Sequence, residues 1–393
     1  MLFGKCIQKG TKSFQKIFKM TQSGDVHRRK HRRGFMEKRL ARREKSRVLW
    51  IDGVRFLAFG VVFTRHYFES FFPENIPEVR GGISAFLWRG ITGKAAVSMF
   101  CVLLGYFVAA SVKKYAFSEY TIRRYLYFMT HLLVVNVIAV MCVILFTLWK
   151  PAVGSVFIWL TLDLKLPGQW FFSDSLFFSY FLVPTFWCVA DFFLASILIF
   201  FVQKGYAGRK SSHAIGRGEY YRIAVLYIIL AISLRGTWIA NCLLGALLWI
   251  INDLRPPVLE KRVTLVILTV AMIVLYRMPN YTVENYSDYL AWGMSSFLCL
   301  LVCFRVKVLK RILGFPLFSV LGKYAFELYL RLVIVMNACM GFLYAAWETY
   351  LSRPLLIWVG YGSCFVLSLL LAFGIKKCAQ ILQQKFLGLY MER

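Results

Sequence analysis

The chain alternates long blocks of apolar residues with short polar segments. The apolar blocks cover residues 50–72, 92–112, 126–148, 174–202, 221–234, 237–251, 263–276, 289–304, 324–346 and 354–375. A transmembrane helix needs about 20 predominantly apolar residues. Several blocks meet that length and three or four are short. The pattern predicts an all-α, polytopic membrane helix bundle of about ten transmembrane helices.

Two local features refine this prediction. The blocks on either side of Arg235 and Gly236 are closely spaced, and we interpret them as a helical hairpin with a tight turn. The apolar stretch 151–162 is too short to span a bilayer, so we expect an interfacial or re-entrant piece there.

Composition excludes two other classes. Hydrophobic residues make up 59% of the 393 residues and the mean hydropathy is +0.61, above the range of ordinary soluble domains. Aromatic residues reach 17%, which is too many for a disordered chain. The ten cysteines form no Cys-x-x-Cys pair, so the sequence predicts neither a zinc site nor a disulfide framework, and we expect no bound metal.

The formal charge of +29 is unevenly distributed over the polar segments between these blocks. Short cytoplasmic loops of membrane proteins collect Lys and Arg. If both termini are cytoplasmic, the six inner segments carry a net +29 and the five outer segments only +2. The charge pattern therefore predicts ten helices with both termini inside. It also predicts a basic tail over 1–47, a membrane domain over 48–376 and a short cytoplasmic tail over 377–393.

The tail over 1–47 has a net charge of +13. Such a tail could bind nucleic acid. Next to a membrane span, however, a basic segment more often lies on anionic lipid headgroups. We therefore expect membrane lipid, and no nucleic acid, as its partner.

Eight ionisable residues other than histidine remain inside the predicted spans. They are Asp52, Arg55, Arg65, Glu69, Asp174, Asp191, Glu327 and Arg331. Each is costly in a bilayer unless it is paired or faces a cavity, so each is a functional candidate. Glu327 and Arg331 lie four residues apart, and an internal ion pair between them is the simplest interpretation.

The first apolar block, residues 50–72, contains the most closely spaced ionisable candidates. Arg55 and His66 are eleven residues apart, which brings them to nearly the same face of a helix with roughly 16 Å between them. Asp52 lies one turn before Arg55, and Glu69 lies one turn after His66. A carboxylate that holds an imidazole favours general-base chemistry. A histidine that only hydrogen-bonds a neighbouring helix is the simpler alternative, and the stripe of ionisable groups favours chemistry.

The run from Asp52 to His66 resembles the first-helix signature of the acyltransferase family 3 membrane proteins, in which an arginine is followed after ten residues by a histidine. Residues 93–107 resemble the family's glycine-, valine- and phenylalanine-rich segment ending in Ser-Gly-Phe. Residues 120–124 occupy the position of its double-arginine entry to the third helix.

Two later segments extend the resemblance over about residues 48–376. Trp170 and Ser173 begin a segment similar to the family's Trp-x-Leu-Ser run. Residues 321–331 resemble its Gly-Lys motif, which continues through Tyr-Leu to a histidine. There are departures. The acid that commonly follows the Trp-x-Leu-Ser run is not evident, Leu104 replaces a serine, Tyr127 replaces a third arginine, and Arg331 replaces the terminal histidine.

The resemblance implies a bacterial, multi-pass cell-membrane enzyme that moves an acetyl or other short acyl group from cytosolic acyl-CoA to a hydroxyl of a glycan. Glycan biosynthesis proteins are possible partners. His66 would be the general base or transient acyl carrier, Glu69 would orient it, and Arg55 would position donor phosphate or stabilise developing charge.

The cationic residues at the cytoplasmic helix ends suit the phosphates of the donor. They are Lys113, Lys114, Arg123 and Arg124. Further substrate-binding or structural candidates are Asp52, Arg65, Trp170, Ser173, Glu327, Tyr329 and Arg331. A transporter or flippase for a glycolipid or small molecule is the main alternative function, and a signalling or scaffold protein is a third.

Overall fold

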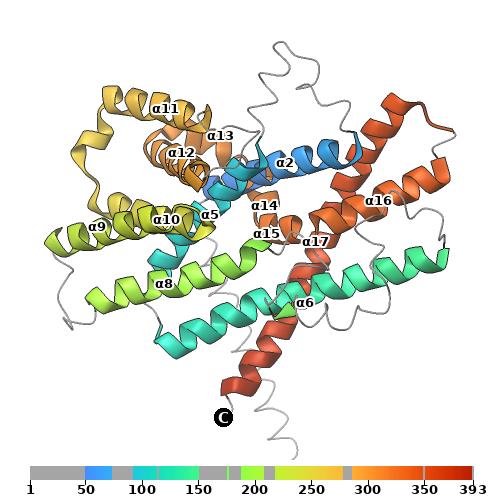
Figure 1. Ribbon diagram of the computed structural model, residues 1–393, viewed down its shortest axis with the longest axis horizontal. Coiled ribbons are helices and arrows are strands. Elements are labelled where there is room, and N and C mark those ends of the chain that lie inside the picture. Colours follow the sequence, from blue (N-terminus) through green and yellow to red (C-terminus); the bar gives the residue numbers. More distant parts are fainter. Residues whose placement is uncertain are drawn as a thin grey trace, which may run out of the picture. The chain divides into compact units, whose positions relative to one another are not determined.

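The computed structural model describes residues 49–72, 92–112, 115–149, 175–176, 187–207, 217–277, 286–347 and 350–391, and every regular element in these ranges is a helix (Figure 1). The helices are α2 (Leu49–Phe71), α5 (Gly93–Ser111), α6 (Phe117–Trp149), α8 (Val189–Ala207), α9 (Arg217–Ser233), α10 (Trp238–Leu254), η5 (Pro257–Glu260), α11 (Arg262–Arg277), α12 (Tyr286–Arg305), α13 (Lys307–Leu313), α14 (Pro316–Gly322), α15 (Ala325–Leu330), α16 (Leu332–Trp347) and α17 (Arg353–Met391).

The contacts divide the chain into two units, Met1–Leu49 and Trp50–Arg393. Apart from Leu49, the first unit lies outside the described residues, and so does the predicted lipid contact of the basic tail. The second unit contains all the packing considered below.

Each of the ten apolar blocks overlaps a helix. The expected hairpin is present, since α9 ends at Ser233 and α10 begins at Trp238. Three described helices are long and apolar enough to cross a bilayer, namely Gly93–Ser111, Phe117–Cys142 and Arg353–Leu389. The bent pair α12 and α13, at 103°, could count as a fourth. Ten crossings and two cytoplasmic termini remain predictions. The stretch 151–162 lies outside the described residues.

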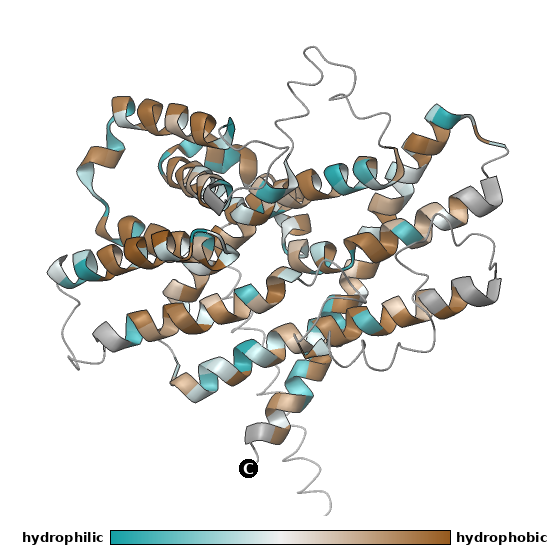
Figure 2. Ribbon diagram, in the orientation of Figure 1, coloured by the Kyte–Doolittle hydropathy of each residue, from teal (hydrophilic) through white to brown (hydrophobic). Residues whose placement is uncertain are grey.

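Exposed apolar side chains indicate that the helices contact lipid. On α11, Val263, Val266 and Ile267 are 60–72% exposed, and that helix has no buried residue. Hydrophobic residues cover most of α10 and α11 (Figure 2). In water such a surface would be an aggregation liability, whereas in a bilayer it contacts lipid tails at no cost. The chain is therefore a membrane protein.

Small residues set the close packing of α5 against α10. A Cβ at Gly105 would overlap the backbone carbonyl of Cys242, and one at Gly245 would overlap that of Val102. Without a hydrophobic driving force inside a bilayer, helices associate through such close backbone contact. This pair is the rigid centre against which α8 and α12 also pack.

The helix α2 is fixed on two sides. Its Phe63 and Tyr67 pack on Tyr361 of α17, and the Tyr67 hydroxyl donates to the carbonyl of Ile357 at 2.7 Å. At its first turns, a Cβ at Gly322 of α14 would overlap the carbonyl of Asp52. The second contact brings the segment after α14 next to the end of α2 that carries Arg55.

The segment between α12 and α16 departs from the simple pattern. Residues 305–323, expected to be a polar loop, form the short helices α13 and α14. The block 324–346 is not one helix, because α15 ends at Leu330 and α16 begins at Leu332. These breaks bring Lys323 and Glu327 into the interior of the bundle.

Candidate functional site

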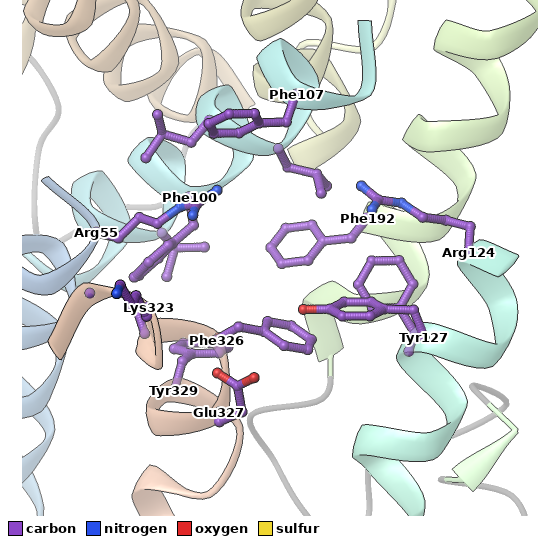
Figure 3. A pocket seen from close by; sticks show the side chains of 16 residues that line it. Arg55, Phe100, Phe107, Arg124, Tyr127, Phe192, Lys323, Phe326, Glu327 and Tyr329 are labelled. Atoms are coloured by element: carbon purple, nitrogen blue, oxygen red, sulfur yellow. The ribbon is translucent and has the colours of Figure 1, made fainter. Parts of the chain in front are cut away.

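A cavity of ≈190 Å³ lies among α2, α5, α6, α8 and the α14–α15 segment (Figure 3). Its walls are largely aromatic, with Phe100, Phe107, Phe192 and Phe326 contributing rings. Its polar lining residues are Arg55, Arg124, Tyr127, Lys323, Glu327 and Tyr329. Three cations and one carboxylate around an aromatic space favour an anionic ligand with an apolar part.

Arg55 reaches the cavity from α2. Its guanidinium is 3.1 Å from the carboxylate of Asp52, which is 2% exposed, and lies 4.7 Å from the centre of the Phe107 ring. Both contacts hold a planar guanidinium in one orientation, and Figure 3 shows it facing the cavity.

Arg124 reaches the cavity from α6. Its Nε donates to the Ser196 hydroxyl at 3.3 Å, and the guanidinium lies 5.3 Å from the centre of the Phe128 ring. The neighbouring Arg123 points elsewhere, because it pairs with Glu119 at 2.8 Å and does not line the cavity. Of the two adjacent arginines, Arg124 is the one positioned to bind a ligand there.

Glu327 is the buried carboxylate of the cavity. Its Oε1 lies 3.5 Å from Nε2 of His131 on α6 and 3.5 Å from Nζ of Lys376 on α17. Nδ1 of His131 is 2.6 Å from the carbonyl oxygen of Tyr127. Since a carbonyl only accepts, Nδ1 must carry a proton and donate it there.

The expected ion pair between Glu327 and Arg331 is not present within the described part of the chain. Arg331 is fully buried, and its guanidinium donates to the carbonyl of Ser368. Helix α15 ends at Leu330, and the φ of Arg331 is −105°, outside the helical range. The side chain of Arg331 therefore does not continue the face of α15 that carries Glu327. Tyr329 keeps its place in the cavity wall, with its hydroxyl 3.4 Å from Sγ of Cys188.

His66 lies at the other end of α2 from Arg55. Its Nδ1 is 3.0 Å from the carbonyl oxygen of Val62, so this nitrogen donates and Nε2 is left with its lone pair in the neutral ring. Among the described residues no hydrogen bond joins Glu69 to His66, since Glu69 pairs instead with Arg65 at 2.5 Å. The backbone, rather than Glu69, fixes the imidazole tautomer.

The cavity extends toward His66 along α5. Its lining on that helix runs from Phe107 to Val97, ten residues or about 15 Å. Val97 is one turn from Gly93, where a Cβ would lie 4.0 Å from Cε1 of His66. The cavity therefore has a cationic end at Arg55 and a second end that approaches the histidine.

A second cavity of ≈500 Å³ lies on the other side of α2, against α5, α11 and α12. Its walls are mostly aliphatic, with Val54, Ala96, Met272 and Ile273 among them. None of the predicted site residues lines it, whereas the smaller cavity includes four of them. We therefore assign the candidate site to the smaller cavity. In the described ranges no group of three or more His, Cys, Asp or Glu residues is placed to hold a metal ion.

Sequence reasoning found part of this site. Arg55, Arg124, Glu327 and Tyr329 meet in the cavity, while Asp52 supports Arg55 from α2. The remaining candidates Lys113, Lys114, Trp170 and Ser173 lie outside the described residues.

Three residues were missed. His131 is an ionisable side chain inside the apolar block 126–148, and counting histidines with the other ionisable residues would have found it. Lys323 belongs to the Gly-Lys motif quoted above. Lys376 immediately follows the last block, and nothing in its position marked it as a partner of Glu327.

The comparisons with known proteins identify the family of the chain. No curated protein and no solved structure gives a significant match. The family model described as an acyltransferase domain, that of acyltransferase family 3, matches residues 48–375, which include every residue of the cavity. The chain therefore belongs to the acyltransferase family 3 of membrane proteins.

Proposed function

We propose that this membrane acyltransferase transfers an acetyl or other short acyl group from cytosolic acyl-CoA to a hydroxyl of a cell-surface or exported glycan. Family membership supplies the reaction class. The observation that carries the finer proposal is the meeting of Arg55 and Arg124, from two separate helices, in one aromatic cavity that extends toward His66.

The cationic end of the cavity suits the donor's phosphates. Guanidinium groups bind phosphate through paired hydrogen bonds, and those of Arg55 and Arg124 are already oriented by Asp52 and Ser196. Lys323 adds a third positive charge. Lys113 and Lys114 lie outside the described residues, and in this proposal they would also bind donor phosphate.

The end of the cavity that approaches His66 suits acyl transfer. With Nδ1 donating to Val62, the lone pair on Nε2 can remove the proton from the acceptor hydroxyl. The hydroxyl oxygen then attacks the thioester carbonyl, the C–S bond breaks, and the CoA thiolate takes up the proton that Nε2 holds. In the covalent variant, Nε2 attacks the thioester carbonyl, the C–S bond breaks and the CoA thiolate leaves. The acceptor hydroxyl then attacks the acyl group, the N–acyl bond breaks, and the thiolate takes up the hydroxyl proton.

One charged residue, Glu69, assists His66 in this proposal. Glu69 lies one turn from His66 and its negative charge would stabilise an imidazolium through space, although its direct hydrogen bond goes to Arg65. The charge pattern puts His66 in the outer half of the first span, so transfer would take place near the outer face of a bacterial plasma membrane. Proteins of glycan synthesis would deliver the acceptor.

The test is acyl transfer by the purified protein in lipid nanodiscs, with radiolabelled acetyl-CoA and a glycan extract of the source cells. We expect label in the glycan with the wild type and at least a hundredfold less with His66→Ala. The Glu119→Gln variant, which changes a half-exposed ion pair outside the cavity, serves as the matched control and should transfer normally. Full transfer by His66→Ala would contradict the proposed role of this residue.

A further inference from the structure

Glu327 has one carboxylate oxygen that no described group satisfies. Its side chain is 3% exposed, and Oε2 is buried without a hydrogen-bond partner among the described residues. The residue lines the cavity, and Figure 3 shows its carboxylate turned toward the cavity interior. Leaving a buried charged acceptor unsatisfied is costly, so the arrangement suits a ligand that supplies the missing donor.

The other carboxylate oxygen is already occupied. Both His131 and Lys376 contact Oε1, and the imidazole of His131 is itself held by the carbonyl of Tyr127. The carboxylate is therefore held through Oε1, and Oε2 is left without a partner among the described residues at the wall of the cavity. A fixed acceptor of this kind selects a hydrogen-bond donor on the ligand and rejects a second anion or a carbonyl oxygen.

A hydroxyl group also points into the cavity. Figure 3 shows the phenol oxygen of Tyr127 directed at the cavity interior, and within the described ranges this hydroxyl has no hydrogen bond. A phenol can donate to a carbonyl oxygen. Glu327 and Tyr127 together thus offer one acceptor and one donor, which is the complement of an amide group with its N–H and C=O.

Glu327 and Tyr127 are placed to contact the middle segment of an extended donor, next to its phosphates. Tyr127 lies about one helical turn beyond Arg124 on α6. Glu327 lies four residues after Lys323, across the break between α14 and α15, and both line the cavity. A ligand whose phosphates contact Arg124 and Lys323 would bring its next segment to Glu327. In acyl-CoA that segment is the pantetheine arm, which contains two amides and ends in the thioester.

We propose that Glu327 is a donor-binding residue that accepts a hydrogen bond from an amide N–H of the pantetheine arm, with Tyr127 donating to an amide carbonyl. His131 and Lys376 are positioning residues that hold the carboxylate. This inference rests on the proposed use of acyl-CoA and deepens it, because it names the part of the donor that the cavity recognises.

The test compares acetyl-CoA with two analogues, in each of which one pantetheine amide N–H is replaced by an ester oxygen. Loss of a charge-assisted hydrogen bond in a buried site should raise the KM of the wild type for one analogue by about 10- to 100-fold, with a much smaller change in kcat. The binding of the corresponding CoA analogues, measured without turnover, should weaken by the same factor.

The variants complete the comparison. Glu327→Gln should bind acetyl-CoA more weakly and lose most of the preference for acetyl-CoA over the ester analogue. Glu327→Leu should lose all of that preference. Lys376→Arg should retain the discrimination that Lys376→Met loses, which separates positioning from a general loss of structure. Glu119→Gln, outside the cavity, should behave like the wild type.

The outcomes are separable. If the wild type binds CoA and both analogues equally, or if Glu327→Leu still discriminates, the role of Glu327 is refuted while the proposed function stands. If the wild type neither binds CoA nor uses acetyl-CoA, the proposed function itself fails. Because the first comparison uses only the wild type, the inference is tested even if a variant does not fold.

Discussion

Replacing Arg124 by methionine separates a phosphate-binding role from a structural one. Methionine preserves most of the aliphatic stem, but it removes the charge, the donors and the guanidinium that lies over the Phe128 ring. A charge-assisted hydrogen bond contributes about 1.5–3 kcal/mol, so we expect the KM for acetyl-CoA to rise roughly 10- to 150-fold. The kcat should change little, because the lost interaction binds donor and transition state equally.

The assay is acetyl transfer at varied donor concentration, with acetyl-CoA compared with acetyl-pantetheine, which lacks the nucleotide. The wild type should prefer acetyl-CoA, and Arg124→Met should lose most of that preference. Arg123→Met is the matched control, since Arg123 is adjacent in sequence, half exposed and paired with Glu119. Equal effects of the two substitutions, or an unchanged preference in Arg124→Met, would refute the assignment of Arg124 to donor phosphate.

Three further predictions concern chemistry and packing. His66→Gln should lower kcat by about 10²–10⁴ and leave the KM for acetyl-CoA within a few-fold; a rise in KM with normal kcat would contradict a chemical role. Gly105→Val should lower the thermal unfolding temperature in detergent, because its Cβ would overlap α10, whereas Gly60→Ala enters open space and should not; equal stability of both variants would argue against the close α5–α10 packing. Arg331→Met removes a fully buried guanidinium, two of whose nitrogens have no hydrogen-bond partner among the described residues, so the unfolding temperature should stay the same or rise; a fall of several degrees would indicate that the hydrogen bond to Ser368 stabilises the fold.

Helix positions were predictable because the apolar blocks are long and the polar segments between them are short. The hairpin around Arg235 is a case in which charge and spacing sufficed. The break at Arg331 was not predictable from hydropathy, since residues 324–346 form one apolar block. Breaks of this kind depend on tertiary contacts, here the burial of Arg331 against α17, which hydropathy does not encode.

Some contacts of the candidate site were likewise predictable from the sequence, and others were not. The spacing of Arg55 and His66 on one helix was readable from local periodicity. The meeting of Glu327 with His131 and Lys376 joins three helices that are distant in sequence. Contacts of that kind follow from packing and leave no periodic signal. A single sequence shows such partners only as isolated ionisable residues in or beside apolar blocks.

Two departures from the family pattern fall within the cavity. Leu104 and Tyr127 both line it. The cavity therefore carries an aliphatic and a phenol side chain where the resemblance leads one to expect a serine and an arginine. Tyr127 removes one positive charge from the wall and supplies a hydroxyl group, and Lys323 supplies a cation from α14–α15. We expect these positions to tune which donor is bound.

The central claim is that one donor occupies the cavity with its phosphates at Arg55 and its acyl group toward His66. Photolabelling with an acyl-CoA that carries a diazirine on the acyl chain tests it most directly. We expect labelled peptides from α2 around His66 and from the start of α5 near Val97, with labelling suppressed by excess CoA. Labelling confined to Met272 and its neighbours in the second cavity, or labelling that excess CoA does not suppress, would contradict it.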